Sequence, residues 1–157
     1  MRIRIYYEDT DCGGILYHTN YIKYCERARS ELFFSRGLLP SQASAGFVVS
    51  AMEAKFLGFA RLGDMLEVRS KLTKLGKVQI VLHQDIYKLP HFCVDSSVNV
   101  LESTQKSIQQ KPLNIPSEEK IFSAQVRLGY VDVLSQKPVA IPKHLEQIFL
   151  ELGNDIH

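Results

Sequence analysis

The chain has 157 residues, of which 45% are hydrophobic and 23% charged, as in one packed globular domain. Its formal net charge is only +2, and it has no run of Lys or Arg and no zinc-finger spacing that would favour nucleic-acid binding. There is no apolar run of the roughly 20 residues that span a bilayer, and no signal-peptide core. The three cysteines, Cys12, Cys25 and Cys93, form no Cys-x-x-Cys pair. We therefore expect a single cytoplasmic domain over residues 1–157 with no membrane span.

The first predicted elements are a short strand and a long helix. Residues 2–7 alternate in charge and bulk, as in a strand, and a cluster of turn-forming residues follows at 9–14. The helix is predicted from Thr19 to about Arg36. Its apolar face consists of residues at helical spacing, namely Tyr21, Cys25, Ala28 and Leu32. We expect Thr19 or Asn20 to cap its start and the following glycine to end it.

Beyond Gly46 the pattern is mainly that of strands. Strands are predicted at residues 47–59, 66–72, 78–86, 92–100 and 122–130. A hairpin turn is expected at Leu75-Gly76-Lys77, and residues 103–120 are polar, contain two prolines and are expected to form a loop. In the tail, apolar residues at i, i+3, i+4 and i+7 predict a short helix; they are Leu145, Ile148, Phe149 and Leu152.

A strand, a long helix and then a run of antiparallel strands predict the α+β class. A helix of about 18 residues is roughly 27 Å long and covers one face of a sheet. The other face is expected to keep apolar residues that nothing else in the chain buries. Oligomer formation through the sheet is therefore expected.

The residues before the predicted helix carry the chemistry. Asp11 lies in a glycine-containing loop that leads directly into the helix. Unpaired backbone N–H groups at a helix start, here at His18 and its neighbours, favour developing negative charge. A carboxylate facing such donors pairs a nucleophile or base with an electrophile. This pair suits a thioester, because a thiol leaving group has a pKa of about 8.5 and needs no strong general acid.

The pattern Y-x-D-T-D-x-x-G-x-x-Y-H-x-N-Y, from Tyr7 to Tyr21, resembles the start of the hotdog-fold thioesterases of the YbgC and 4-hydroxybenzoyl-CoA thioesterase group. Weaker matches occur at Gly63-Asp64 and in residues 126–128 and 137–142. The resemblance implies a hotdog fold, in which an antiparallel β-sheet wraps a long central helix. It also implies hydrolysis of acyl-CoA thioesters to free acid and CoA.

The resemblance implies roles for individual residues. Asp11 would be the nucleophile or general base, the backbone N–H of His18 would polarise the thioester carbonyl, and Tyr7 and the His18 ring would line the site. The expected substrate-binding residues are Tyr17, Asn20, Phe59 and Ala60. Two residues depart from the family pattern, since Cys12 and Phe59 stand where proline is common. The site would lie between two subunits of a homo-oligomer, either a dimer or a dimer of dimers, and a homotetramer is favoured.

Other interpretations of these residues stay open. Cys12 offers a rival nucleophile with His18 as its base, and Asp9 is interpreted as a brace for the turn. The remaining histidines have no ligand spacing, so neither a metal nor a cofactor is expected. Four cations that could meet CoA phosphates are interpreted as a solvated face: Arg61, Lys71, Lys74 and Lys77. Alternatives on the same fold are a non-catalytic acyl-CoA sensor, an acyl carrier protein thioesterase and an acyl-thioester hydratase.

Overall fold

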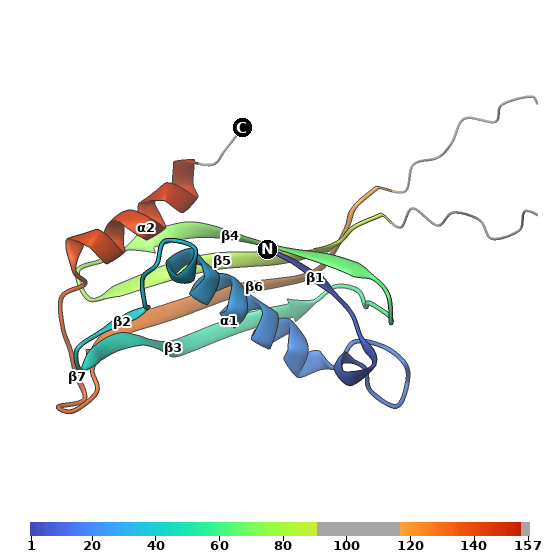
Figure 1. The fold of residues 1–157 in the computed structure, drawn as a ribbon, viewed down its shortest axis with the longest axis horizontal. Coiled ribbons are helices and arrows are strands. Elements are labelled where there is room, and N and C mark those ends of the chain that lie inside the picture. The colour runs from blue at the N-terminus through green and yellow to red at the C-terminus, as the bar shows by residue number, and fades with distance from the viewer. Residues whose placement is uncertain (91–116, 155–157) are drawn as a thin grey trace, which may run out of the picture.

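One long helix lies along the inner face of a curled antiparallel sheet in the computed structural model, which describes residues 1–90 and 117–154 (Figure 1). The strands are β1 (Arg2–Arg4), β2 (Ser41–Gln42), β3 (Ala45–Phe56), β4 (Met65–Leu75), β5 (Gln79–Lys88), β6 (Glu119–Asp132) and β7 (Lys137–Pro138). The helices are α1 (His18–Phe34) and α2 (Lys143–Asn154). Within the described residues the sheet order is β1-β4-β5-β6-β3-β2, and β7 pairs with the end of β6. This arrangement confirms the predicted α+β class.

One apolar face holds α1 against the sheet. Its inward residues are at most 6% exposed; they are Tyr21, Tyr24, Cys25 and Ala28. Gly37, at φ 68°, follows the helix and ends it close to the predicted position. The predicted caps Thr19 and Asn20 are wrong, because Tyr17 is the N-cap and makes no side-chain capping bond. The Tyr17 N–H instead donates to the carbonyl of Asp9 at 2.9 Å, which fixes the start of the helix there.

Strands β5 and β6 follow the predicted alternation. The buried inward residues of β5 and β6 include Ile80, Leu82, Ile86, Phe122, Ala124, Val126 and Tyr130. In the predicted hairpin turn between β4 and β5, the N–H of Gly76 donates to the carbonyl of Gln79 at 2.8 Å. β6 begins at Glu119, so the predicted loop extended two residues too far. The strand predicted at 92–100 and the loop at 103–116 lie outside the described residues.

The terminal helix α2 packs against β4 and the end of α1. Its residues Leu145, Ile148 and Phe149 are buried, as their spacing predicted. The Phe149 ring meets Phe33 of α1 at 5.5 Å and Phe47 of β3 at 5.3 Å between ring centroids. Neither helix in the described part of the chain is long and apolar enough to cross a membrane.

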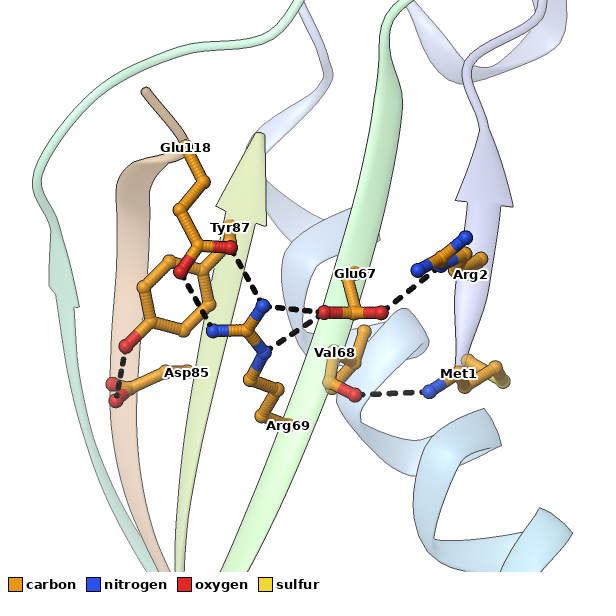
Figure 2. A network of polar contacts seen from close by, with 8 residues as sticks. All are labelled: Met1, Arg2, Glu67, Val68, Arg69, Asp85, Tyr87 and Glu118. Carbon is orange, nitrogen blue, oxygen red and sulfur yellow. Dashed lines mark hydrogen bonds and ion pairs between the residues drawn. The ribbon is translucent and has the colours of Figure 1, made fainter. Parts of the chain in front are cut away.

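The outer face of the sheet is polar over β4, β5 and β6, so the expectation of exposed apolar residues there is wrong. Alternate residues of a strand point to opposite faces, and the residues between the buried ones are largely polar or charged, including Arg69, Asp85 and Gln125. Arg69 donates to the carboxylates of Glu67 and Glu118, at 2.6 Å to each (Figure 2). Asp85 pairs with Lys120 at 2.7 Å on the same face. This network gives the outer face favourable contacts with water and removes the predicted reason for oligomer formation.

One group of exposed apolar side chains lies on β3 and the segment after it. Four side chains there are at least 50% exposed, namely Val49, Phe56, Leu57 and Phe59. β3 pairs with β6 along its length, but on its other side β2 reaches only Ala45 and Gly46. From residue 47 to residue 56 this edge has no strand partner among the described residues. An open edge of this kind favours pairing with another chain.

The packing of α2 can be tested with two leucines of the same helix. Leu145 is 1% exposed and Leu150 is 42% exposed. We expect Leu145→Ala to lower the free energy of unfolding by about 2–5 kcal/mol, because buried contacts are lost and a cavity is left. Leu150→Ala should change it by less than about 0.5 kcal/mol. Urea denaturation measures both, and equal effects would contradict the docking of α2.

Candidate active site

Asp9 joins the N-terminal segment to the start of α1. A short 3₁₀ turn, Tyr7–Asp9, follows β1. The Asp9 side chain is buried, and its Oδ2 accepts the N–H of Tyr6 at 2.9 Å. Its backbone carbonyl accepts the N–H of Tyr17 and the side-chain amide of Asn20, both at 2.9 Å. These contacts support the interpretation of Asp9 as a brace, and they set where the next loop leaves the domain.

The loop that carries Asp11 is closed at its base. Thr10 and Leu16 form an antiparallel bridge, and the Asp11 N–H donates to the carbonyl of Ile15 at 2.9 Å. The Asp11 carbonyl then accepts the N–H of Gly14, which has φ 74°, a conformation that favours glycine. The loop is therefore a tight turn with a defined backbone.

The same loop is attached to the segment between β3 and β4. The Leu16 N–H donates to the carbonyl of Ala60 at 2.8 Å, and Ile15 forms a bridge with Arg61. The Phe59 ring next to Ala60 is 51% exposed and lies 5.1 Å from the Arg61 guanidinium carbon. Residues 59–61, the Asp11 loop and the start of α1 thus meet at one end of the molecule, beyond the end of β3 and the start of β4 (Figure 1).

The Asp11 carboxylate is oriented by its own loop. Its Oδ1 accepts the N–H of Gly13 at 2.8 Å and that of Ile15 at 3.5 Å. A Cβ at position 13 would lie 3.1 Å from Oδ1, so glycine allows this close approach. Both hydrogen bonds found within the described residues go to Oδ1. The other oxygen, Oδ2, is therefore available to a ligand, and the side chain is only partly buried.

The start of α1 supplies hydrogen-bond donors. His18 is its first residue, and neither the Tyr17 side chain nor any other group of the described chain accepts from the His18 backbone N–H. Helix N-termini carry unpaired N–H groups and a partial positive charge, which stabilise an anion. The His18 side chain is exposed, and its ring packs edge-on against Tyr17 with centroids 4.5 Å apart. A carboxylate loop and a helix start therefore lie at the same end of the molecule.

The other predicted site residues fall into two groups. Tyr7, Tyr17 and Phe59 are 82%, 45% and 51% exposed, so they are accessible to a ligand. Asn20 and Ala60 are buried and hold the Asp11 loop and the start of α1 in place. The Asn20 amide donates to the Asp9 carbonyl, and the Ala60 carbonyl accepts the N–H of Leu16. The hydrogen bond of the Asn20 amide could not be predicted from the sequence, because its acceptor is a backbone carbonyl eleven residues earlier. Arg61, which the sequence left on a solvated face, lies beside the Asp11 loop.

The described residues contain no group of three or more His, Cys, Asp or Glu side chains that could hold a metal ion. Burial raises the pKa of the Cys25 thiol to about 12, the nearby charge of Asp85 adds to this effect and the charge of Arg29 opposes it. Cys12 is an exposed free thiol next to Asp11. Of these two thiols only Cys12 is accessible to a substrate. A test of Asp11 as the attacking group must therefore also test Cys12 as a rival nucleophile.

Comparison with known proteins gives a consistent result. Residues 13–91 match the model of the thioesterase superfamily, a range that begins two residues after Asp11. An acyl-CoA thioesterase YbgC from Helicobacter pylori is 40% identical over 156 residues, which are 99% of this chain and 100% of that protein. An acyl-CoA thioester hydrolase YbgC from Escherichia coli is 35% identical over 118 residues, 73% of this chain and 87% of that one.

A solved structure supports the same fold. A 1,4-dihydroxy-2-naphthoyl-CoA thioesterase from Synechocystis superposes with a TM-score of 0.68 at 16% sequence identity. The superposition covers 99% of this chain and 95% of that one. The hotdog fold that the sequence resemblance implied is confirmed.

The brace between Asn20 and Asp9 can be tested by removing the amide. We expect Asn20→Ala to lower the free energy of unfolding by about 1 kcal/mol, because a buried hydrogen bond is lost while Tyr17 still donates to the same carbonyl. Backbone amides of residues 11–15 should exchange with solvent roughly fivefold faster. The neighbouring exposed residue provides the control, Thr19→Ala, which should change neither value. Unaltered exchange in Asn20→Ala would contradict the brace.

Proposed function

Because the chain belongs to the thioesterase superfamily, we propose that it hydrolyses acyl-CoA thioesters to free acid and CoA. The relative that is 40% identical over nearly the whole chain, an acyl-CoA thioesterase, supports this substrate class. The observation that carries the mechanism is the Asp11 carboxylate, held in a closed loop that leads into the uncapped start of α1.

Asp11 supplies the attack in this proposal. Its Oδ2 either attacks the thioester carbonyl carbon directly or removes a proton from a water molecule that attacks it. Direct attack forms a mixed anhydride of Asp11 and the acyl group as the carbon–sulfur bond breaks and the thiolate of CoA leaves, and a water molecule then hydrolyses the anhydride to the free acid and the Asp11 carboxylate. When water attacks instead, the carbon–sulfur bond breaks to give the free acid and the thiolate of CoA, and Asp11 returns its proton to solvent. A thiol has a pKa of about 8.5, so the thiolate needs no strong general acid to leave and takes a proton from water afterwards. One carboxylate is therefore enough for a thioester.

The start of α1 supplies the electrophilic half. As the carbonyl carbon is attacked, negative charge develops on its oxygen. The His18 backbone N–H is a fixed donor for that charge, and it needs no rearrangement during the reaction. The His18 ring and Tyr7 are proposed to line the site, with Tyr17 and Phe59 contacting the substrate. Asn20 and Ala60, which the resemblance implied as substrate contacts, are proposed to act by holding the loop and the helix start in place.

The site is proposed to be completed by a second copy of the chain. Tyr7 and Phe59 are largely exposed in the single chain, so one copy provides little enclosure for an acyl group. Pairing of two β3 edges would continue the sheet across the dimer and cover the exposed apolar side chains along it. A homotetramer would be a dimer of such dimers. The edge of β3 supports this assembly better than the polar outer face does.

The free thiols Cys12 and Cys25 support a reducing compartment, in keeping with the expected cytoplasmic location. No cofactor is required by the proposed chemistry.

Asp11→Asn tests the mechanism. Asn has nearly the same shape but is neither a base nor an anionic nucleophile. We expect the fold to be retained and the turnover number to fall by about 10²–10⁴-fold. Release of thiol from acyl-CoA, followed with a thiol reagent over a series of acyl chain lengths, measures this. The same series on acyl carrier protein would distinguish the two carriers.

Cys12→Ala is the matched control at the adjacent position. It should keep turnover within severalfold of the wild type, because the exposed thiol takes no part in the proposed attack. If Cys12→Ala abolished turnover with an intact fold, and Asp11→Asn did not, the cysteine mechanism would replace the one proposed. No turnover of any thioester by the wild type would favour a non-catalytic acyl-CoA sensor.

The shared site predicts that assembly and activity fall together. On dilution below the dissociation constant of the dimer, turnover per subunit and the midpoint of thermal unfolding should both decrease, because the pocket exists only in the assembled state. Light scattering and rate measurements at the same concentrations check this. A monomer with full activity would refute the shared site.

A further inference from the structure

A hollow lies on the outer face of the sheet, on the side away from α1. Its volume is about 440 Å³, and residues of β3, β4, β5 and β6 line it, among them Lys74, Val81 and Arg127. Lys74 is nine residues from Met65, the first residue of β4, which corresponds to about 30 Å along a strand. The hollow is therefore remote from the end of the molecule that carries the Asp11 loop.

Two β-bulges flank this outer hollow. The register of β4 against β5 shifts between Leu72 and Lys74, and that of β3 against β6 shifts between Val49 and Ala51. Each shift inserts one extra residue into its strand. A bulge bends the strand and redirects its side chains, and bulges are frequent next to functional sites. The concave shape is thus produced by the backbone of both flanking strands.

Both bulges adjoin one row of the sheet, and this row carries two cations. Lys74 pairs with Val81 across the sheet, and Val81 pairs with Arg127. The extra residues of the bulges hold the row, because Thr73 Oγ1 donates to the Val81 carbonyl at 2.9 Å and Ser50 Oγ to the Arg127 carbonyl at 3.3 Å. Neighbouring strands are about 4.8 Å apart, so the backbones of Lys74 and Arg127 are about 10 Å apart with Val81 between them.

The charges of this row are not compensated. In the part of the chain that the structure describes, neither Lys74 nor Arg127 forms an ion pair. Glu53 also lines the hollow, but its carboxylate lies 3.9 Å from the ammonium of Lys55, which compensates its charge. The hollow therefore has two exposed cations that are available to an anion.

The opposite half of the same face shows the contrast. There Arg69 is paired with both Glu67 and Glu118 (Figure 2). Lys120 is likewise paired with Asp85. The cations of that half are matched by carboxylates of neighbouring strands, so the uncompensated positive charge belongs to the row between the bulges and is not a general property of the face.

Shape and charge together define the ligand. A hollow of about 440 Å³ falls within the roughly 300–1,000 Å³ of small-molecule sites. Two cations on either side of Val81 suit an anion with more than one negative group. Lys supplies a point charge and Arg a planar fork of donors, and both bind phosphate oxygens. A long nucleic acid is a poor fit, since the paired acids of Figure 2 lie on the same face.

We propose that the outer hollow is a binding site for a small anion with a pyrophosphate group, held between Lys74 and Arg127 above Val81. The pyrophosphate is either free or part of a nucleotide. From the sequence Lys74 was interpreted as part of a solvated face, because its neighbour Arg127 is 53 residues away and is brought beside it only by β5. The site binds its ligand without catalysis and stands independently of the proposed hydrolysis.

Inorganic pyrophosphate is the probe, added to the full-length protein while backbone amide signals are followed by NMR. The signals of Lys74, Val81 and Arg127 should move in the wild type. We expect Lys74→Gln and Arg127→Gln each to weaken binding by about fivefold, the effect of one exposed charge pair. Lys120→Gln is the matched control, a cation of the same face with its own carboxylate, and it should bind as the wild type does. Equal weakening in Lys120→Gln, or none in the other two variants, would overturn the proposal.

Glu53→Gln keeps the test decisive if the other variants do not fold, because a gain of affinity does not arise from unfolding. It removes the carboxylate that lines the hollow and leaves Lys55 without its partner. We expect pyrophosphate to bind this variant about two- to fivefold more tightly. Unchanged affinity in Glu53→Gln, or wild-type shifts confined to the Asp11 loop, would refute a site at this row.

ADP and adenosine distinguish the two sources of the phosphate. Tighter binding of ADP than of pyrophosphate would assign the site to a nucleotide, and the reverse order would assign it to the free anion. Adenosine has no phosphate and should leave the three signals in place; the same shifts with adenosine would contradict the proposal. Because these readouts report binding and not turnover, failure of the proposed hydrolysis would leave them unchanged.

Discussion

Burial of one face of α1 on the concave side of the sheet is the constraint on which the rest of the molecule depends. Tyr21, Tyr24, Cys25 and Ala28 pack onto the inner residues of the sheet and are almost completely removed from water. This packing fixes where the helix lies on the sheet, and the bond from the Tyr17 N–H to the Asp9 carbonyl fixes where it begins. The helix start in turn fixes the donors that the proposed chemistry uses. The same contact also sets the depth of Arg29, which lies on the buried side of the helix among groups that hold its partner Gln84 in place.

The end of the molecule that carries the proposed site is assembled from segments that are weak on their own. A three-residue strand, a 3₁₀ turn and a tight loop carry little hydrophobic surface, and they are positioned by backbone hydrogen bonds. The carbonyl of Asp9 accepts two donors from the helix start, and the loop itself binds to the carbonyl of Ala60. This division leaves Oδ2 of Asp11 without a hydrogen bond within the described residues, while Oδ1 is held by its own loop. Asp11 and His18 are both accessible, whereas Asn20 and Asp9 are buried beneath them.

The outer face of the sheet and the open edge of β3 differ in polarity. The outer face of β4, β5 and β6 carries polar and charged side chains, several of which pair with one another, so it is compatible with water as it stands (Figure 2). The open edge of β3 has both unpaired backbone groups and exposed apolar side chains, including Val49 and Phe56. Edge and side chains together indicate where a second copy would bind.

The amino-acid sequence determined those properties that depend on local periodicity and turn chemistry. The spacing of Tyr21, Cys25 and Ala28 predicted the long helix, the strands alternated as observed, and Asp11 and His18 could be singled out because they flank a glycine loop before a helix. Tertiary structure decided what depends on distant partners. The helix cap was displaced to Tyr17 by a bond to Asp9, and the outer face proved polar because charged residues from three strands pair across it. The burial of Arg29 and its hydrogen bond to Gln84 could not be predicted from the sequence, because they arise only when α1 and β5 are brought together. The local sequence pattern predicts on which side of its helix or strand a side chain lies. Which residues that side chain contacts, and how far it is exposed to water, depend on how the helices and strands pack together.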